Sequence, residues 1–406
     1  MISDGKSGGS LVDNALRVMI LTRTFPPDSG AVGHLVKELA ESLVKDDFQL
    51  TIIAAGAETE SSSSAINVVR VGGLPFSRQS HLQRAVSYLS LYPAMLWAAL
   101  RQRKPDVIIT TTDPPLQALI GVLLRWKFRS RLLHWCQDLY PEMAEEAGLI
   151  KKNGLIANVL RWISTSTLQA HDGIISIGRC MTQRLLDRGL DRTKIHEIPN
   201  WTDPEWIRPV PTAENSFVKT QQLEGRFVVV YSGNMGIAHR FSELLEAAAL
   251  LEKQAPDVLF LFIGDGPRRA EVERQAQKSE RTSIRFLPPQ PWKTLPESLS
   301  AGQVHLVSLR ENLAGLVVPS KFYGGMAAGR PCLFIGPPES EVARLIQENG
   351  VGMVVQTGAE LAAAILDYRG DLERLQREQS KARELGSRST VQHSSLLIQR
   401  LFADNI

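Results

Sequence analysis

Short runs of apolar residues alternate along the chain with longer segments whose apolar positions repeat every three or four residues. The first run covers residues 17–21, and Leu35, Leu39 and Leu43 then mark one face of a helix, together with Val36, Ala40 and Val44. Five more runs follow before residue 200, at 50–53, 68–71, 107–110, 132–135 and 173–177. Apolar strands that alternate with helices predict a parallel sheet that is covered on both faces.

The same pattern starts again after a segment at 199–211 that is rich in proline and polar residues and is typical of a hinge linker. The later runs cover 227–231, 259–263, 284–287, 304–307, 332–335 and 353–355. We therefore predict an α/β protein of two Rossmann-like, doubly wound domains that face a cleft. The carboxyl ends of the strands should lie at that cleft, where such sheets bind ligands.

The length of 406 residues fits two domains, because a single core of this size would be unusual. Residues 1–16 are polar and rich in Gly and Ser, which predicts a disordered tail and not a signal peptide. We place the first domain at 17–205, the second at 206–385, and a final amphipathic helix at 386–406. No apolar run is long enough to predict a membrane-spanning helix.

Hydrophobic residues make up 43% of the chain and charged residues 22%, which is an ordinary globular composition. The three cysteines, Cys136, Cys180 and Cys332, are an odd number without the spacing of a metal site. This argues against a disulfide framework and favours a reducing compartment.

The net charge is only +3, but it is unevenly distributed. Residues 70–131 contain ten basic and two acidic residues, a net charge of +8, interleaved with aromatic and apolar residues. Nucleic acid would suit basic and aromatic residues together, but the helical spacing of the apolar residues favours an anionic membrane surface. A solvated helix face explains the charges equally well.

Glycine-bearing loops follow three of the predicted strands. Gly30 and Gly33 lie after the first strand of the first domain, in the sequence Phe25-Pro-Pro-Asp-Ser-Gly-Ala-Val-Gly. Gly233, Asn234 and Gly236 follow the first strand of the second domain, and Gly264, Asp265 and Gly266 follow its second strand. Such loops can present backbone N–H groups to an anion, or they can simply be tight turns between a strand and a helix.

The most specific stretch is Val317-Val-Pro-Ser-Lys-Phe-Tyr-Gly-Gly-Met-Ala-Ala-Gly-Arg-Pro331. Ser320 can cap a helix there, and Gly329 can end it. The amides at the start of this helix, together with Lys321, would suit a diphosphate. Close packing of a small-residue helix on the sheet is the alternative.

Asp138 follows the strand at 132–135 and would lie at the carboxyl end of the sheet. A carboxylate there could act as a base toward a substrate in the cleft. The residues alone favour a simpler role, the cap of a following helix.

Taken together and in this order, these motifs resemble family 4 of the GT-B glycosyltransferases, especially bacterial enzymes of surface-polysaccharide pathways such as the colanic-acid and N-acetylfucosamine transferases. The other matching stretches are Gln137-Asp-Leu-Tyr-Pro-Glu142 and Ile198-Pro-Asn-Trp-Thr-Asp203. The resemblance implies a nucleotide-sugar site in the second domain, an acceptor site in the first, and retention of anomeric configuration. It implies no metal and no cofactor, and a last helix that returns to the first domain.

The site that this resemblance implies has two catalytic residues, Asp138 near the acceptor hydroxyl and Lys321 at the diphosphate. The expected donor-binding residues are Gly30, Gly33, Gly233, Asn234, Gly236, Arg240, Gly264, Asp265, Gly266, Leu287, Pro319, Ser320, Phe322 and Tyr323. Either Lys321 or Arg240 would supply the cation. Two glutamates that are frequent in the family are replaced here by Leu316 and Gly324, and its usual basic pair by His239 and Arg240.

The expected reaction is sugar transfer from an NDP-sugar to a saccharide, on a polyprenyl-diphosphate carrier or free, with no role for nucleic acid. The expected location is the cytoplasm, peripherally on the inner face of the membrane. A nucleotide-sugar epimerase of the same fold is one alternative. A non-catalytic nucleotide-sugar-binding scaffold, suggested by Leu316 and Gly324, is the other.

Overall fold

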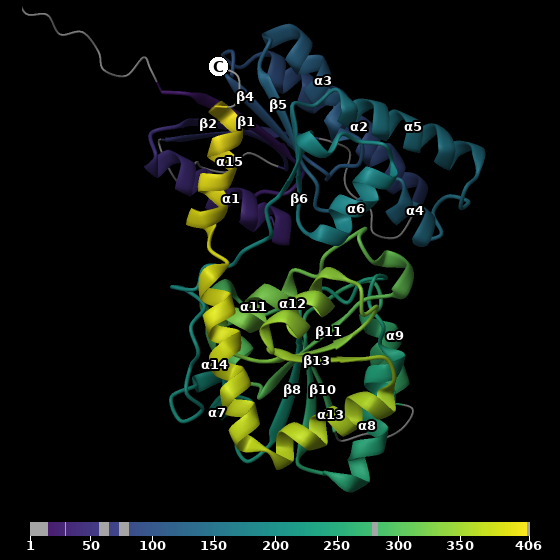
Figure 1. Cartoon of the computed structure of the whole chain (residues 1–406), viewed down its shortest axis with the longest axis vertical. Helices are drawn as coiled ribbons and strands as arrows, with labels where there is room; N and C mark the ends of the chain where they lie inside the picture. Colours follow the sequence, from purple (N-terminus) through teal and green to yellow (C-terminus); the bar gives the residue numbers. More distant parts are fainter. Residues whose placement is uncertain (1–14, 29, 57–64, 73–80, 278–282, 404–406) are drawn as a thin grey trace, which may run out of the picture. The chain divides into compact units, whose positions relative to one another are not determined.

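The computed structural model describes residues 15–28, 30–56, 65–72, 81–277 and 283–403 (Figure 1). Of the predicted tail at 1–16, residues 1–14 lie outside this range. The first sheet has seven strands in the order β3-β2-β1-β4-β5-β6-β7. Its strands are β1 (Arg17–Thr22), β2 (Gln49–Ala55), β3 (Ile66–Val71), β4 (Val107–Thr111), β5 (Arg131–Trp135), β6 (Gly173–Ser176) and β7 (Ile195–Glu197).

All six strands predicted in the first half are confirmed, and β7 is an addition. It escaped prediction because a three-residue strand with one buried apolar residue, Ile195, carries no periodic signal. The helices of this half are α1 (Ala31–Lys45), α2 (His81–Leu100), α3 (Gln117–Phe128), α4 (Glu142–Glu146), α5 (Leu155–Gln169) and α6 (Arg179–Asp187), with a 3₁₀ turn η1 (Arg192–Lys194).

The second sheet has six parallel strands in the order β10-β9-β8-β11-β12-β13. They are β8 (Phe227–Ser232), β9 (Val258–Ile263), β10 (Ile284–Leu287), β11 (Val304–Ser308), β12 (Cys332–Ile335) and β13 (Gly352–Val355). The helices and 3₁₀ turns of this half are α7 (Ser216–Thr220), α8 (Ser242–Gln254), α9 (Arg269–Gln277), η2 (Trp292–Thr294), α10 (Leu295–Ser300), η3 (Glu311–Leu313), α11 (Lys321–Ala327), α12 (Glu341–Asn349), α13 (Gly358–Gly370), α14 (Leu372–Arg388) and α15 (Val391–Ala403).

Helices cover both faces of the second sheet (Figure 1). Alternate residues of β8 point to opposite faces, so Val229 and Tyr231 join one core while Val228 and Val230 join the other. The first core includes apolar residues of α8, α9 and α13, and the second includes residues of α7. Burial on both faces explains why these strands are continuous apolar runs.

The strands of the first sheet are likewise buried by helices that pack on the sheet. Met19 and Leu21 of β1 pack in one core with apolar residues of α2 and α3, including Met95 and Leu124. The predicted apolar face of α1 is confirmed, because Leu35, Val36, Leu39, Ala40 and Leu43 are buried. The sequence periodicity therefore identified the buried side of this helix.

Contacts divide the chain into two compact units. The first unit contains residues 1–135, 166–174 and 402–406, and the second contains residues 136–165 and 175–401. The domain limits at residues 205 and 385, and the cleft between the domains, remain predictions.

The predicted hinge segment at 199–211 is firmly anchored within the second unit. The Arg383 guanidinium donates to the carbonyl groups of Pro204 and Ile207 at 2.9 Å, and to that of Ala327 at 2.8 Å. Ile207 is also buried. Residues 204–207 therefore have a defined place against α11 and α14.

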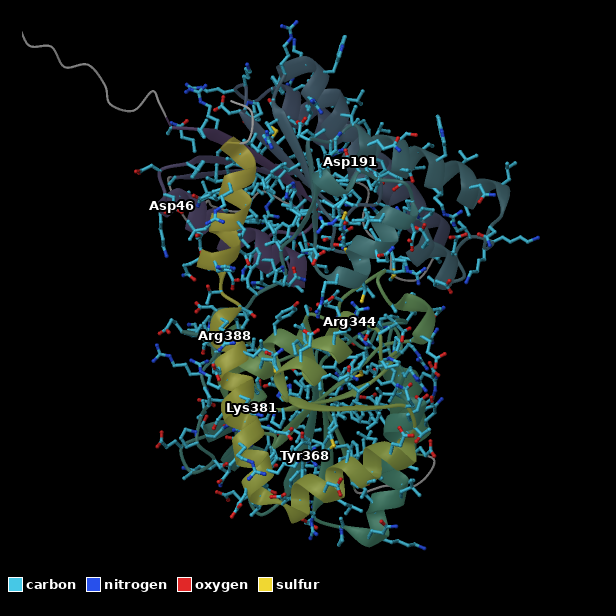
Figure 2. All side chains as sticks on the ribbon, viewed as in Figure 1. Asp46, Asp191, Arg344, Tyr368, Lys381 and Arg388 are labelled. Atoms are coloured by element: carbon cyan, nitrogen blue, oxygen red, sulfur yellow. The ribbon has the colours of Figure 1, made fainter. Side chains whose placement is uncertain are left out.

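Two aromatic residues of the last three helices have defined contacts. Tyr368 of α13, labelled in Figure 2, is fully buried, and its hydroxyl donates to Glu378 of α14. Phe402, near the end of α15, meets Phe48 edge to face with ring centroids 5.6 Å apart, and both residues belong to the first unit. The return of the whole last helix to the first domain remains a prediction. Among the described residues, no helix is long and apolar enough to span a bilayer.

Candidate functional site

The strand order of the second sheet reverses between β8 and β11, and the loops that follow these two strands meet at their carboxyl ends. The ring nitrogen Nδ1 of His239 lies 2.6 Å from the carbonyl oxygen of Ser308. The Arg240 N–H donates to the Ser308 hydroxyl at 3.1 Å, and the Arg310 N–H donates to the Ala238 carbonyl at 2.9 Å. Ligands of doubly wound sheets bind at such a reversal point.

The glycines of the two loops after β8 and β9 allow these loops to touch through their backbones. A Cβ atom at Gly264, where φ is +140°, would lie 2.1 Å from the carbonyl oxygen of Gly233. A Cβ atom at Gly266, where φ is +148°, would lie 2.7 Å from the Met235 nitrogen. Packing between loops is therefore sufficient to explain Gly264 and Gly266.

Only part of the loop at 233–236 has amides that an anion could use. The Gly233 N–H donates to the Ile263 carbonyl at 2.9 Å, and the Met235 N–H donates to the Asp265 carbonyl at 2.7 Å. The N–H groups of Asn234 and Gly236 form no hydrogen bond with any described residue. Two donors, and not four, are thus available in this loop.

Lys321 points back into the same loop. Its Nζ lies 2.8 Å from the Tyr231 hydroxyl and 2.8 Å from Nε2 of His239, and it is 4.4 Å from the centre of the Tyr231 ring. A Cβ atom at Gly233 would lie 3.2 Å from Cε of Lys321, so the absence of a side chain there makes room for the lysine stem. Within the described residues, no carboxylate pairs with this ammonium group, and its third N–H has no partner.

Burial without a counter-ion lowers the pKa of Lys321 from 10.5 to about 7. The residue as a whole is partly exposed, because it begins a helix at the surface, but its ammonium group is enclosed. A buried cation of this kind is unfavourable by itself and becomes favourable when an anion approaches. An enclosed cation without a counter-ion makes this loop a candidate anion site.

His239 is a neutral ring that accepts a hydrogen bond from Lys321. Burial, followed by the charges of Lys321, Arg268 and Arg310, lowers its pKa to about 3, so the ring is neutral at physiological pH. Its Nδ1–H donates to the Ser308 carbonyl, which leaves the Nε2 lone pair to accept from Lys321. Tyr231 accepts from the same ammonium and donates to the Asn234 carbonyl at 2.9 Å.

Other cations around the loop differ in how fully they are paired. Arg240, one of the two expected diphosphate cations, donates to Glu243, to which its Nε lies 2.7 Å away. Arg268 forms a two-fold ion pair with Glu271 at 3.0 Å. The Arg310 side chain forms no hydrogen bond or ion pair with a described residue. The charge of Arg240 is therefore already balanced, which favours Lys321, with Arg310 nearby.

Helix α11 begins differently from its prediction. Ser320 occupies the cap position, but its side chain makes no capping hydrogen bond, so the predicted capping role is wrong. The Phe322 N–H donates a long hydrogen bond of 3.3 Å to the Pro319 carbonyl. The Tyr323 hydroxyl is buried without a partner among the described residues, which makes it an available hydrogen-bond donor.

Gly325 and Ala327 of α11 allow close packing, which was one of the two interpretations of this stretch of the sequence. A Cβ atom at Gly325 would lie 3.1 Å from the His305 ring, and one at Gly386 of α14 would lie 2.5 Å from the Ala327 backbone. Gly329, with φ of +65°, follows the end of the helix as predicted. Gly324 has room around it, since its nearest neighbour is a Leu299 methyl group at 3.4 Å.

Asp138 is not a helix cap, because α4 begins at Glu142 with Pro141 in the cap position. Instead Asp138 forms an antiparallel bridge with Val317, and the Leu139 N–H donates to the Leu316 carbonyl at 2.9 Å. The second unit thus contains Asp138 and the segment that leads to Lys321. Leu316, at a position where the family often has glutamate, is buried there.

Of the remaining donor-binding candidates, Leu287 and Gly33 have structural roles within their own units. The Leu287 carbonyl accepts from the Gly264 N–H at 3.1 Å, and Asp265 is exposed. In the first unit, a Cβ atom at Gly33 would lie 3.0 Å from the Thr24 carbonyl oxygen, so the glycine allows α1 to approach the loop after β1. Gly30 has no such close neighbour.

Three residues of the site were absent from the predicted set, namely Tyr231, His239 and Arg310. His239 was noted only for its place beside Arg240. The available signal for Arg310 was a basic residue two positions after the end of a strand, since β11 ends at Ser308. Tyr231 gave no such signal, because it lies within the apolar run of β8 and looks like a core residue. Among the described residues, no group of three or more His, Cys, Asp or Glu side chains is arranged to hold a metal ion.

Comparison with family models places two known domains on the chain. Residues 30–201 match the glycosyl transferase 4-like domain, and residues 226–371 match the glycosyl transferases group 1 domain. The two matches follow the first and second sheets in order and together cover well over half of the chain.

Curated relatives point to the same class of protein. The probable glycosyltransferase WbjE of Pseudomonas aeruginosa is 30% identical over 252 residues, which are 62% of this chain and 62% of that protein. The putative colanic acid biosynthesis glycosyl transferase WcaI of Escherichia coli is 24% identical over 92% of this chain and 96% of its own length.

Solved structures share the fold at low sequence identity. HepE of Anabaena, crystallised with UDP and glucose, is 15% identical and superposes with a TM-score of 0.73 over 95% of this chain and 98% of its own. Sucrose-phosphate synthase of Thermosynechococcus elongatus is 16% identical, with a TM-score of 0.74 over 95% and 98%. These similarities establish the two-sheet architecture.

Proposed function

Because this chain belongs to family 4 of the GT-B glycosyltransferases of polysaccharide biosynthesis, we propose that it transfers a sugar from an NDP-sugar to a saccharide hydroxyl, with retention of anomeric configuration. The proposed sugar is a hexose or an N-acetylhexosamine, and the acceptor is carried on a polyprenyl diphosphate. The product would be a bacterial exopolysaccharide, O-antigen or capsule.

The observation that carries this proposal is the uncompensated charge of Lys321 at the reversal point of the second sheet. An NDP-sugar brings a diphosphate, which is the counter-ion that this site lacks. The N–H groups of Asn234 and Gly236 lie in the loop that contacts the lysine, and Arg310 adds a second unpaired cation nearby. HepE, whose fold this chain shares, was crystallised with UDP-glucose.

The proposed reaction breaks the bond between the anomeric carbon and the diphosphate oxygen and forms a bond to the acceptor oxygen on the same face of the sugar. Negative charge grows on the departing diphosphate, so a positioned cation stabilises the transition state more than the ground state. Lys321 would have this role, and a protein cation would replace a metal ion in it. The acceptor proton would pass to Asp138 or to the departing phosphate.

A direct test is the incubation of purified protein with a panel of UDP-, GDP- and dTDP-sugars, with and without saccharide acceptors. The proposal predicts transfer from at least one donor in the presence of EDTA, with an unchanged anomeric configuration in the product. Epimerised donor would support the epimerase instead. Tight binding without transfer or hydrolysis would support the non-catalytic scaffold.

The proposed membrane location rests on the segment at 81–131. Two of the ten basic residues counted at 70–131 are not free surface cations. The Arg70 side chain is buried and donates to the carbonyl oxygens of Phe25 and Ala55, and Arg125 pairs with Asp172 at 2.8 Å. The side chains of Arg84 and Tyr88 lie outside the described part of the chain.

Two tryptophans of this segment are strongly exposed, Trp97 by 59% and Trp126 by 86%. They lie on α2 and α3, which contact each other. The Arg101 guanidinium stacks on Trp97 at 4.4 Å. The other described aromatics, Tyr92 and Phe128, are partly buried and pack against the core, so they would not reach a bilayer.

We therefore expect the protein to bind vesicles that contain anionic lipid, and to release them as salt is raised, because charges are screened over about 8 Å at physiological ionic strength. Trp126→Ala should weaken this binding more than Phe128→Leu. Sedimentation with phosphatidylcholine vesicles, with and without phosphatidylglycerol, measures both effects. Binding that depends on neither lipid charge nor salt would contradict the proposal.

A further inference from the structure

Helix α5 carries an unpartnered apolar face that lies outside the segment at 81–131. Four of its side chains are exposed by 46–81%, namely Leu155, Ile156, Val159 and Trp162. They recur at positions one, two, five and eight of the helix and therefore share one side of it. Exposed apolar side chains are normally scattered singly, so four on one face indicate a contact surface.

The opposite side of α5 is already packed within the second unit. Ala157 is fully buried, and the Arg161 guanidinium pairs with Glu142 at 3.1 Å and with Glu145 at 2.5 Å. The Ser164 hydroxyl donates to the Tyr140 carbonyl at 3.1 Å. These contacts fix the rotation of the helix, so its apolar face is held outward by the fold.

One free cation lies at the start of this face. Residues 142–169 contain three acidic residues, Glu142, Glu145 and Glu146, and three basic ones, Lys151, Lys152 and Arg161, and Arg161 pairs with two of the glutamates on the opposite side of the helix. Lys152 pairs with Glu146 at 2.6 Å, whereas Lys151 is exposed and forms no ion pair with a described residue. A helix with a tryptophan and aliphatic residues on its outer face, preceded by lysines, has the composition of a helix that lies in the headgroup region of a membrane.

We propose that the outer face of α5 is a second membrane-contact surface, which inserts Leu155, Ile156, Val159 and Trp162 into the headgroup region of an anionic bilayer. The proposal extends the membrane location given under the proposed function and does not depend on the donor site. Lys151 contacts lipid phosphates at the start of the helix, and the paired Arg161 keeps the helix on the protein.

The first experiment compares the full-length protein with Ile156→Glu/Trp162→Glu in sedimentation with vesicles of phosphatidylcholine and phosphatidylglycerol. The double variant should bind at least about tenfold more weakly, because two apolar side chains no longer leave water. Leu372→Glu is the matched control, since Leu372 is an exposed apolar residue at the start of α14, and its binding should stay unchanged. Equal binding of all three proteins would overturn the proposal.

The second experiment places an environment-sensitive fluorophore at Val159→Cys in a Cys180→Ser background, since Cys136 and Cys332 are buried. Its emission should shift to the blue on addition of anionic vesicles, while the same label at Leu372→Cys should not respond. Vesicle binding without this shift would mean that the protein docks through another surface. No vesicle binding at all would refute the membrane location itself, and transfer to a soluble acceptor would still test the proposed reaction separately.

The same face could instead bind a second copy of the chain, and sedimentation velocity separates the two cases. A concentration-dependent dimer that disappears in Ile156→Glu/Trp162→Glu would overturn the lipid proposal. A monomer at all concentrations, together with the two results above, would support it.

Discussion

Replacement of Lys321 by methionine should lower kcat/KM by about 10- to 1000-fold, the range expected for the loss of one charge-stabilising donor in a transition state. The kcat should fall as well as the donor affinity, because charge on the diphosphate grows during transfer. Steady-state kinetics with the donor found in the panel measures both parameters. Unchanged kinetics would mean that the diphosphate binds elsewhere.

The same substitution should leave the donor-free protein as stable as before, or make it more stable. Below pH 7 Lys321 is charged in both the folded and the unfolded chain, but only the folded chain buries the charge. Methionine removes this penalty, for a gain of roughly 1–3 kcal/mol. The gain should shrink as pH rises from 7 toward 10.5, where the lysine becomes neutral in both states. A clear loss of Tm at pH 6 would indicate a structural role for Lys321 instead.

His239 offers a matched pair of variants for this interpretation. His239→Gln keeps a neutral acceptor near Lys321, whereas His239→Glu puts a carboxylate in its place and neutralises the ammonium group. Donor binding should therefore weaken much more in the glutamate variant than in the glutamine variant. Equal losses in both would show that the ring acts only through its shape.

Donor affinity should fall about tenfold for each pH unit above pH 7. In the free protein the pKa of Lys321 is about 7, so the lysine is mostly neutral above that pH. A bound diphosphate favours the charged form and raises this pKa, so binding takes up a proton and weakens as protons become scarce. Below pH 7 the lysine is already charged, and the affinity should level off.

The neighbours of Lys321 do not titrate in this range. The pKa of His239 is about 3, and burial raises the pKa of Tyr231 well above 10. An NDP-sugar has both phosphates esterified and stays fully ionised near neutral pH. Calorimetry in buffers of different ionisation enthalpy should detect an uptake of about one proton at pH 8. An affinity that is constant between pH 6 and 9, or an equal pH dependence in Lys321→Met, would refute this assignment.

The sequence by itself determined the two-sheet architecture. All of the predicted strands exist, because a strand that is buried on both faces leaves an unbroken apolar run, and this signal is local. The loops with Gly233 and Gly264 were located correctly for the same reason, since they follow such runs directly. The strand β7 and the failed cap at Ser320 show the limit, because neither depends on a periodic pattern.

Only the tertiary structure decided which charges are free. The sequence offered both Lys321 and Arg240 as the diphosphate cation. In the structure Glu243 balances the arginine, while the partners of Lys321 are neutral groups 82 and 90 residues away. In the same way, the sequence count included Arg70 among the basic residues of a charged surface. In the structure its side chain is buried and donates to the Phe25 carbonyl. The energy of a charge depends on burial and on partners distant in sequence, so no local pattern can report it.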